Sequence, residues 1–272
     1  MFLSTMTYEE IYQAISKEMT DVFAHYEKVV KPKVDRTLKK ATIFPKRVTI
    51  NWKHPQSCNT YTYYVQSNRR GQWNNPFMSV FSEYDGKYGK ELLVIVPNPY
   101  KKELLLNVFT QHFYEQYAAR FLKENNDYYH IVATFLMRNT RSASMGKDLV
   151  SLNEQQTTVP NYTKESMLTI DGLGLGLKSN RGHIVVYKTF VSFDMLFGNQ
   201  YQKIWPIYLY FVCSLAIEAS PKEGQFINSL YEEGAKKIQQ IADEENLSKE
   251  EKCKLIYQEY KQTYLRLVTY IV

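Results

Sequence analysis

The sequence has few of the residues that build metal centres or disulfide frameworks. Its three cysteines, Cys58, Cys213 and Cys253, are odd in number and far apart, which argues against a disulfide framework and a cysteine-type zinc site. The five histidines show no metal-ligand spacing, and the sequence contains no HExxH, GxSxG, P-loop or CxxC motif. We therefore expect no metal, no cofactor and a reducing, intracellular setting.

Long apolar runs are also missing. The most apolar stretch, Ile204–Ile217, is about 14 residues long and contains Pro206, whereas a membrane span needs roughly 20 residues, so it predicts a buried helix. The first residues, MFLSTMTYEE, lack a basic lead and a sustained apolar run, which argues against a signal peptide. These features predict a cytoplasmic protein with no membrane partner.

The charge is moderate, whereas aromatic residues are abundant. The formal net charge of +6 is compatible with RNA or another polyanion as a partner but does not require one. The 23 tyrosines and 14 phenylalanines suit binding surfaces, because tyrosine joins a large apolar ring to a polar tip. They are compatible with a protein partner bound through tyrosine-rich surfaces or the C-terminal helices. A bias in nucleotide composition also explains this abundance of tyrosine and phenylalanine.

Residues 1–40 predict a helix followed by a basic connector. Apolar residues recur at helical spacing over Thr7–Val30, and Thr7 with Glu10 forms a capping box. Pro32 is expected to end this helix. The lysines and arginines that follow form either a solvated, mobile connector or an electrostatic footprint for a polyanion.

Residues 41–192 predict a sheet domain. The segments RVTINW, NTYTYYVQ, FMSVFSEY and ELLVIVP are short, rich in β-branched and aromatic residues, and separated by Gly, Pro and Asn. They therefore predict a four-stranded antiparallel meander. We then expect a helix over Leu104–Glu124, a helix or strand over Tyr128–Arg138, a long polar loop over Asn139–Lys164 and a hairpin over Met167–Ser192.

Residues 193–272 predict a C-terminal helical bundle. The expected helices are Phe193–Gln202, Trp205–Ala219, Glu223–Glu245 and Leu247–Val272, the last with a capping box formed by Ser248 and Glu251. The predicted fold class is therefore α+β: an antiparallel sheet with a packed helix, followed by a C-terminal helical layer. We expect that layer to pack on the sheet domain.

The expected helix Leu104–Glu124 carries the first candidate site. His112, Gln116 and Arg120 are spaced by four residues, so they lie along one stripe of the helix. Arg120 falls on the apolar side, where a guanidinium needs a carboxylate, a carbonyl or a bound anion. Arg120 is either ion-paired inside the fold or it clamps a phosphate while His112 transfers a proton.

The hairpin Met167–Ser192 carries the second candidate site. Pairing Lys178 with His183 across the turn places three glycines and three other side chains on one face. These are Gly172, Gly174, Gly176, His183, Tyr187 and Thr189. Glycines at alternate positions of a strand call for close approach by another element or a ligand. Either Tyr187 lies over the glycines in an aromatic rescue, or this face is a ligand groove.

A helix with a His-x7-Arg pattern after β structure, followed by a hairpin that ends in a Lys-Thr strand, is similar to the barnase, RelE and colicin-type RNase superfamily. The resemblance covers about residues 94–192 and implies metal-independent RNA cleavage with His112, Arg120 and Thr189 as catalytic residues. The candidate substrate contacts are Gln116, Lys178, His183, Tyr187, Arg138 and Arg141. The chain departs from that superfamily in its greater length, its preceding meander and its C-terminal helices.

Two functions follow as alternatives. The first is a metal-independent RNase-like or nucleic-acid-binding protein that acts on phosphodiesters. The second is a non-catalytic interaction or structural protein of a phage or mobile element, since the whole chain also looks like proteins of gut Bacteroidetes and their phages. The second explains the tyrosine content, the charged terminal helices and the missing motifs equally well.

Overall fold

The computed structural model describes residues 2–86, 89–97, 104–123, 127–139, 142–144, 159–195 and 199–271. The chain divides into two compact units, Met1–Ser192 and Phe193–Val272. The predicted connector and sheet regions both lie in the first unit. The division into three regions stays a prediction, and so does the packing of the helical unit on the sheet.

The first unit is built on one sheet, which among the described residues has nine strands. They are β1 (Lys46–Lys53), β2 (Thr60–Ser67), β3 (Phe77–Gly86), β4 (Gly89–Pro97), β5 (Leu104–Phe109), β6 (Ala143–Ser144), β7 (Tyr162–Leu168), β8 (Leu173–Ser179) and β9 (Ile184–Val191). Their order is β1-β2-β3-β4-β5-β9-β8-β7-β6, and β5 with β9 is the one parallel pair within it. The α+β class with an antiparallel sheet and C-terminal helices is therefore confirmed.

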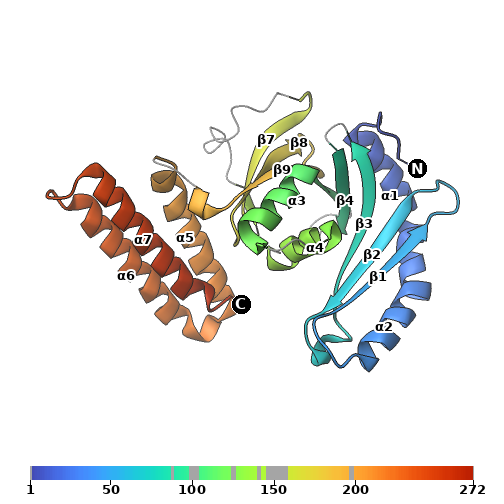
Figure 1. Cartoon of the computed structure of the whole chain (residues 1–272), viewed down its shortest axis with the longest axis horizontal. Helices are drawn as coiled ribbons and strands as arrows, with labels where there is room; N and C mark the ends of the chain where they lie inside the picture. The colour runs from blue at the N-terminus through green and yellow to red at the C-terminus, as the bar shows by residue number, and fades with distance from the viewer. Residues whose placement is uncertain are drawn as a thin grey trace. The chain divides into compact units, whose positions relative to one another are not determined.

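The four-stranded meander is also confirmed. Each of β1 to β4 pairs antiparallel with the next strand of the chain. In β4, Leu92, Leu93 and Val94 are fully buried, because helices cover both faces of the sheet at this central strand. Figure 1 shows α1 and α2 on one side of these strands and α3 and α4 on the other.

The helix that begins at Thr7 is longer than predicted. The capping box of Thr7 and Glu10 is confirmed at the start of α1 (Tyr8–His25). The chain then continues through a π turn (Tyr26–Val30) into α2 (Lys31–Lys40), so the prediction that Pro32 ends the helix is wrong. Pro32 lies in the first turn of α2, directly after the wide turn, where a missing N–H and the proline ring are tolerated.

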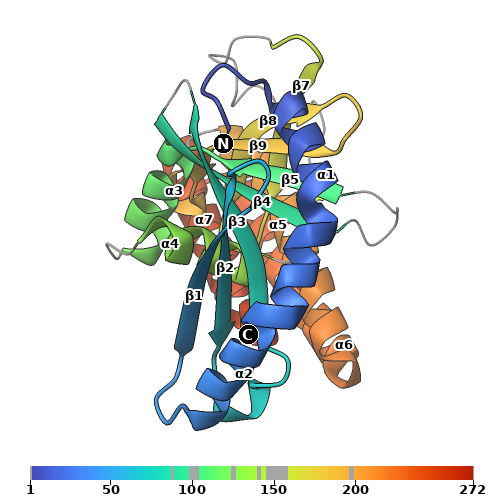
Figure 2. The same cartoon turned by 90° about the vertical axis from the view of Figure 1, so that its right-hand side faces the viewer.

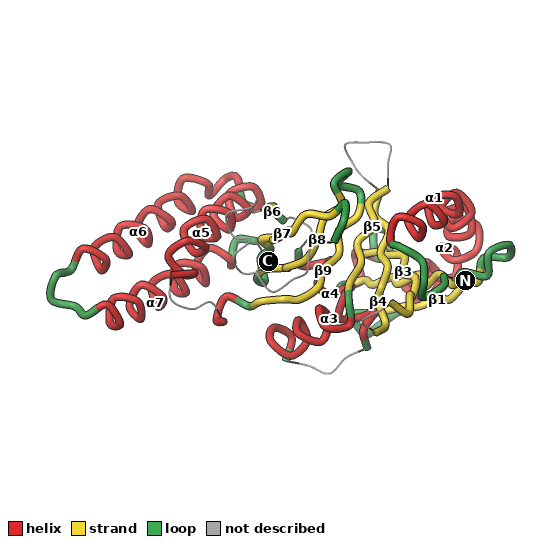
Figure 3. Tube along the Cα trace, turned by 90° about the horizontal axis from the view of Figure 1, so that it is seen from above, coloured by secondary structure: helices red, strands yellow, loops and turns green. Residues whose placement is uncertain are grey.

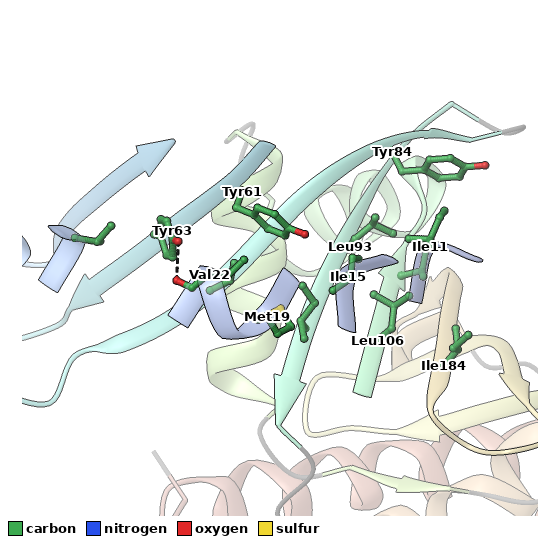
Figure 4. Close-up of a cluster of buried hydrophobic side chains, with 14 of the residues drawn as sticks. Ile11, Ile15, Met19, Val22, Tyr61, Tyr63, Tyr84, Leu93, Leu106 and Ile184 are labelled. Atoms are coloured by element: carbon green, nitrogen blue, oxygen red, sulfur yellow. Dashed lines mark hydrogen bonds between the residues drawn. The ribbon is translucent and has the colours of Figure 1, made fainter. Parts of the chain in front are cut away.

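The basic stretch is therefore helical, and the predicted connector is wrong. Val34 and Leu38 of α2 are buried, while most lysines of this stretch point to solvent. Figure 2 shows α1 running along the strands that it covers. Its apolar stripe of Ile11, Ile15 and Val22 packs on Tyr61, Leu93 and neighbouring side chains of the sheet (Figure 4). The hydroxyl of Tyr63 donates to the Val22 carbonyl, 2.9 Å away.

The opposite face carries α3 (Gln111–Tyr117), a second π turn (Ala118–Leu122) and α4 (Tyr128–Arg138). The prediction of one helix over Leu104–Glu124 is wrong for its first part, since Leu104–Phe109 forms β5. Pairing with β4 on one side and β9 on the other outweighs the helical spacing of this segment. The helix begins only after Thr110, whose side chain accepts from the Phe113 N–H.

Most of the predicted long loop, residues 140–141 and 145–158, lies outside the described residues. The described parts of this region include β6 and the beginning of β7. The hairpin of β8 and β9 is present, but its predicted register is wrong. Lys178 pairs with Val185 instead of His183, because four residues separate the two strands. In this register Gly176 lies opposite Tyr187, and a further shift between Leu175 and Gly176 places Leu175 opposite Thr189, so that Lys188 is an extra residue of β9 at this point.

The second unit is helical, as predicted. It contains α5 (Asn199–Ala219), α6 (Gly224–Asp243) and α7 (Lys249–Val268), which run side by side in Figure 3. Phe193–Met195 forms a short 3-10 turn and Pro206 lies inside α5, so the two helices expected before residue 220 are one helix. The capping box of Ser248 and Glu251 is confirmed at α7.

Among the described residues, no single helix is long and apolar enough to cross a membrane. The pair Ile204–Ala219 and Pro221–Asp243, bent by 116°, meets the length and composition requirement together.

Candidate functional site

The helix α3 begins against strand β9, and Thr110 makes the connection. Its N–H donates to the Tyr187 carbonyl at 3.1 Å, and its hydroxyl donates to the Lys188 carbonyl at 3.0 Å. The same hydroxyl oxygen accepts from the Phe113 N–H at the first turn of α3. Threonine suits this position, because a side-chain oxygen satisfies a free N–H at a helix start.

The end of β9 extends past the strand beside it. β5 pairs with β9 over Ile184–Tyr187, so Lys188–Val191 has no strand on that side among the described residues. Two carbonyls of this segment accept hydrogen bonds from the α3 region instead. Thr110 donates to Lys188, and the Arg120 Nη1 donates to Phe190. We call this the α3–β9 seam, defined by His112, Gln116, Arg120 and the Phe190 carbonyl.

Arg120 lies at this seam without a counter-ion. It is half-buried, and burial lowers the pKa of its guanidinium. In the part of the chain that the structure describes, no carboxylate lies within ion-pair distance of Arg120, and its hydrogen bond is to the Phe190 carbonyl. A guanidinium offers five N–H donors, so most of its hydrogen-bonding capacity is unused. The predicted internal ion pair is thus not found among these residues.

The exposure of α3 fits a helix with one open flank. His112 is exposed, Gln116 is half-buried, and Phe113 and Tyr117 are buried against the sheet. The π turn around Arg120 is of a kind that is rare and often found at functional sites. His112 and Arg120 are about 12 Å apart along the helix axis, given a rise of about 1.5 Å per residue. This separation suits an extended anionic chain better than one phosphate group.

The structure separates the predicted hairpin residues. Tyr187 and Val185 face the side that α3 and α4 cover, and Thr189 is half-buried on the protruding end of β9. His183 lies on the opposite side, with its Nε2 2.9 Å from the Glu9 carboxylate and its ring tilted by 54° to that of Tyr12. The expectation that His183 shares a face with Tyr187 is therefore wrong, because His183 lies in the turn before β9, where the alternation of the strand does not apply.

Arg138 is engaged in a buried network that the sequence did not reveal. Its Nη2 and Nε lie 2.8 and 2.9 Å from the two carboxylate oxygens of Asp171, whose side chain is fully buried. Asp171 also accepts from the Tyr117 hydroxyl at 2.7 Å and from the Asn139 amide at 2.9 Å. The network ties the end of α4 to the turn between β7 and β8. Arg141 lies outside the described residues.

A second group missed from the sequence surrounds Glu91 on the α1 side of the sheet. The Tyr8 hydroxyl lies 3.0 and 2.9 Å from the two oxygens of this fully buried carboxyl group. Burial raises the pKa of Glu91, against the lowering effects of the Tyr8 hydrogen bond and the Lys188 charge. A cavity of about 650 Å³ adjoins the group and is lined by Tyr8, Lys188, Tyr84 and others.

A comparison with protein-family models, with curated protein sequences and with solved structures finds no match to this chain. Among the described residues, no group of three or more His, Cys, Asp or Glu side chains is placed to hold a metal ion. The roles predicted for His112, Arg120, Thr189 and the six substrate contacts therefore stay predictions.

Proposed function

We propose that the first unit binds RNA along the α3–β9 seam and cleaves it without a metal ion. The observation that carries the proposal is Arg120, a half-buried cation with no carboxylate partner among the described residues. A charge with reduced solvation is costly unless an anion pairs with it. A phosphate group supplies that anion, and the planar guanidinium matches its geometry.

His112 supplies the proton transfer in this proposal. Its exposed ring lies on the same flank of α3, two turns before Arg120. As general acid or base it exchanges a proton with the reacting phosphodiester, while Arg120 neutralises charge on the phosphate chain. Gln116 lies between them on the same helix and offers a neutral hydrogen bond to the RNA backbone. The resemblance to metal-independent RNases supports this assignment of roles.

The test is cleavage of labelled single-stranded RNA in the presence of excess chelator. The wild-type protein is expected to cleave, and His112→Ala to be slower by roughly 100-fold or more. Arg120→Ala is expected to cleave more slowly at low RNA concentration through a higher KM, because Arg120 binds a phosphate about 12 Å from His112 and not the reacting one. Arg36→Ala is the matched control, since Arg36 is exposed on α2 across the sheet, and should cleave at the wild-type rate.

Two outcomes of this assay contradict the nuclease. One is cleavage that chelator abolishes, and the other is full activity in the His112 and Arg120 variants. Absence of cleavage by any variant would favour the non-catalytic alternative. That alternative draws support from the second unit, where large apolar side chains are exposed to solvent. These are Ile207, Tyr210, Phe226 and Leu265, at 46%, 64%, 56% and 53%.

A further inference from the structure

A second cavity lies beside α4 and the strands that it covers, and it extends to the α1 side of the sheet, where Phe23 and Ile95 line it. Its volume is about 630 Å³, and its apolar wall includes Phe135, Leu136, Met167 and Val185. Asn107 of β5 and Tyr187 of β9 also line it. Cavities of this size with apolar walls and a few convergent polar groups are the usual form of small-molecule sites.

The polar groups of this cavity are unpartnered. In the described ranges of the chain, no residue forms a hydrogen bond with the Asn107 amide or the Tyr187 hydroxyl. Asn107 is half-buried and Tyr187 is buried, and neither polar group is among the solvent-excluded atoms that lack a partner, so both are open to the cavity that the two residues line. The ammonium group of Lys178, a half-buried residue that also lines the cavity, has no described partner either. A ligand would satisfy all three.

The packing around Tyr187 holds its hydroxyl in place. Its ring stacks on Phe109 with centroids 4.7 Å apart and planes within 3°. On the hairpin, a Cβ atom at Gly174 would lie 3.0 Å from the Tyr187 ring, so a residue larger than glycine would displace the ring slightly. This is the predicted aromatic rescue, and it fixes the hydroxyl that lines the cavity.

Asn107 and Tyr187 are set at a fixed spacing by the sheet. Asn107 is the parallel partner of Val185, and Tyr187 lies two residues farther along β9 on the same face. From the strand spacing and the rise per residue, their Cα atoms are about 8 Å apart. Lys178 pairs with Val185 from the other side and shares this face. The three side chains therefore project from one face of the sheet, from β5, β9 and β8.

We propose that this cavity binds an adenine nucleotide, with the base at Asn107 and Tyr187 and the phosphate at Lys178. The amide of asparagine presents a donor beside an acceptor, which matches the amino group and ring nitrogen on one edge of adenine. Phe135, Leu136 and Met167 cover the faces of a flat ring. The site is distinct from the α3–β9 seam and does not depend on RNA cleavage.

The test is isothermal titration of the full chain with AMP and with inosine monophosphate, in which an oxygen replaces the adenine amino group. AMP is expected to bind at least tenfold more tightly. Asn107→Ala should weaken AMP binding at least tenfold and remove the preference over inosine monophosphate. Tyr187→Phe, which deletes one hydroxyl and keeps the ring, should weaken AMP binding several-fold. Lys178→Ala should make AMP bind no better than adenosine.

One matched control accompanies the titration. Asn51→Ala changes an asparagine of β1, outside the cavity, and should bind AMP as the wild type does. Titration with a short oligoadenylate distinguishes a free nucleotide from the end of an RNA chain as the source of the base. No AMP binding, equal binding of inosine monophosphate, or unchanged binding by Tyr187→Phe would overturn the proposal.

Discussion

Replacing Arg138 with alanine is expected to lower the free energy of unfolding by about 3 kcal/mol. The change leaves the fully buried carboxylate of Asp171 without its cation, which is costly because little water reaches it. The Tyr117 and Asn139 hydrogen bonds remain but do not neutralise the charge. Urea denaturation followed by circular dichroism measures the difference.

Two further variants make this prediction specific. Arg181→Ala removes an exposed arginine of the β8–β9 turn and should change the free energy of unfolding by less than about 0.5 kcal/mol. Combining Arg138→Ala with Asp171→Asn removes the stranded charge and should recover part of the loss. A loss below about 1 kcal/mol for Arg138→Ala alone would contradict the assignment of this network to the stability of the first unit.

Replacing Gly176 with alanine is expected to cost about 3 kcal/mol or to prevent folding. A Cβ atom at this position would lie 1.8 Å from the Val186 carbonyl oxygen, a backbone atom that cannot move without breaking the β8–β9 pairing. The register irregularity between Leu175 and Gly176 brings the two strands this close. Thermal and chemical unfolding of the variant measure the cost.

The control for this substitution is Gly71→Ala, where an added Cβ atom would meet nothing within 4 Å. Its stability should lie within about 0.5 kcal/mol of the wild type. Equal stability of the Gly176 and Gly71 variants would show that the strands do not approach as closely at Gly176 as the structure indicates.

The sequence predicted the elements whose local patterns agree with the fold. The strands β1 to β4 alternate or are uniformly apolar between turn residues, and both capping boxes combine a hydroxyl with a glutamate three residues later. β5 was missed because its apolar run, LLLNVF, is as compatible with a helix as with a strand. Its state is decided by β4 and β9, the second of which lies about 80 residues later in the chain.

The candidate site was predictable only where it lies on one element. His112, Gln116 and Arg120 share α3, so their spacing was visible in the sequence. The pairing of Arg138 with Asp171 joins residues 33 positions apart, and no local pattern indicates it. The separation of His183 from Tyr187 arises because His183 lies in the four-residue turn before β9, which the glycine spacing alone does not reveal.

Contact between Arg120 at the α3–β9 seam and an RNA backbone predicts a particular salt dependence of RNA binding. Affinity for a short single-stranded RNA is measured at several salt concentrations for the wild type, Arg120→Ala and Arg36→Ala. One lost phosphate contact should reduce the slope of log affinity against log salt by about 0.7 in Arg120→Ala. The slope of Arg36→Ala should equal that of the wild type. Equal slopes in all three proteins, or no RNA binding by the wild type, would contradict the proposed contact.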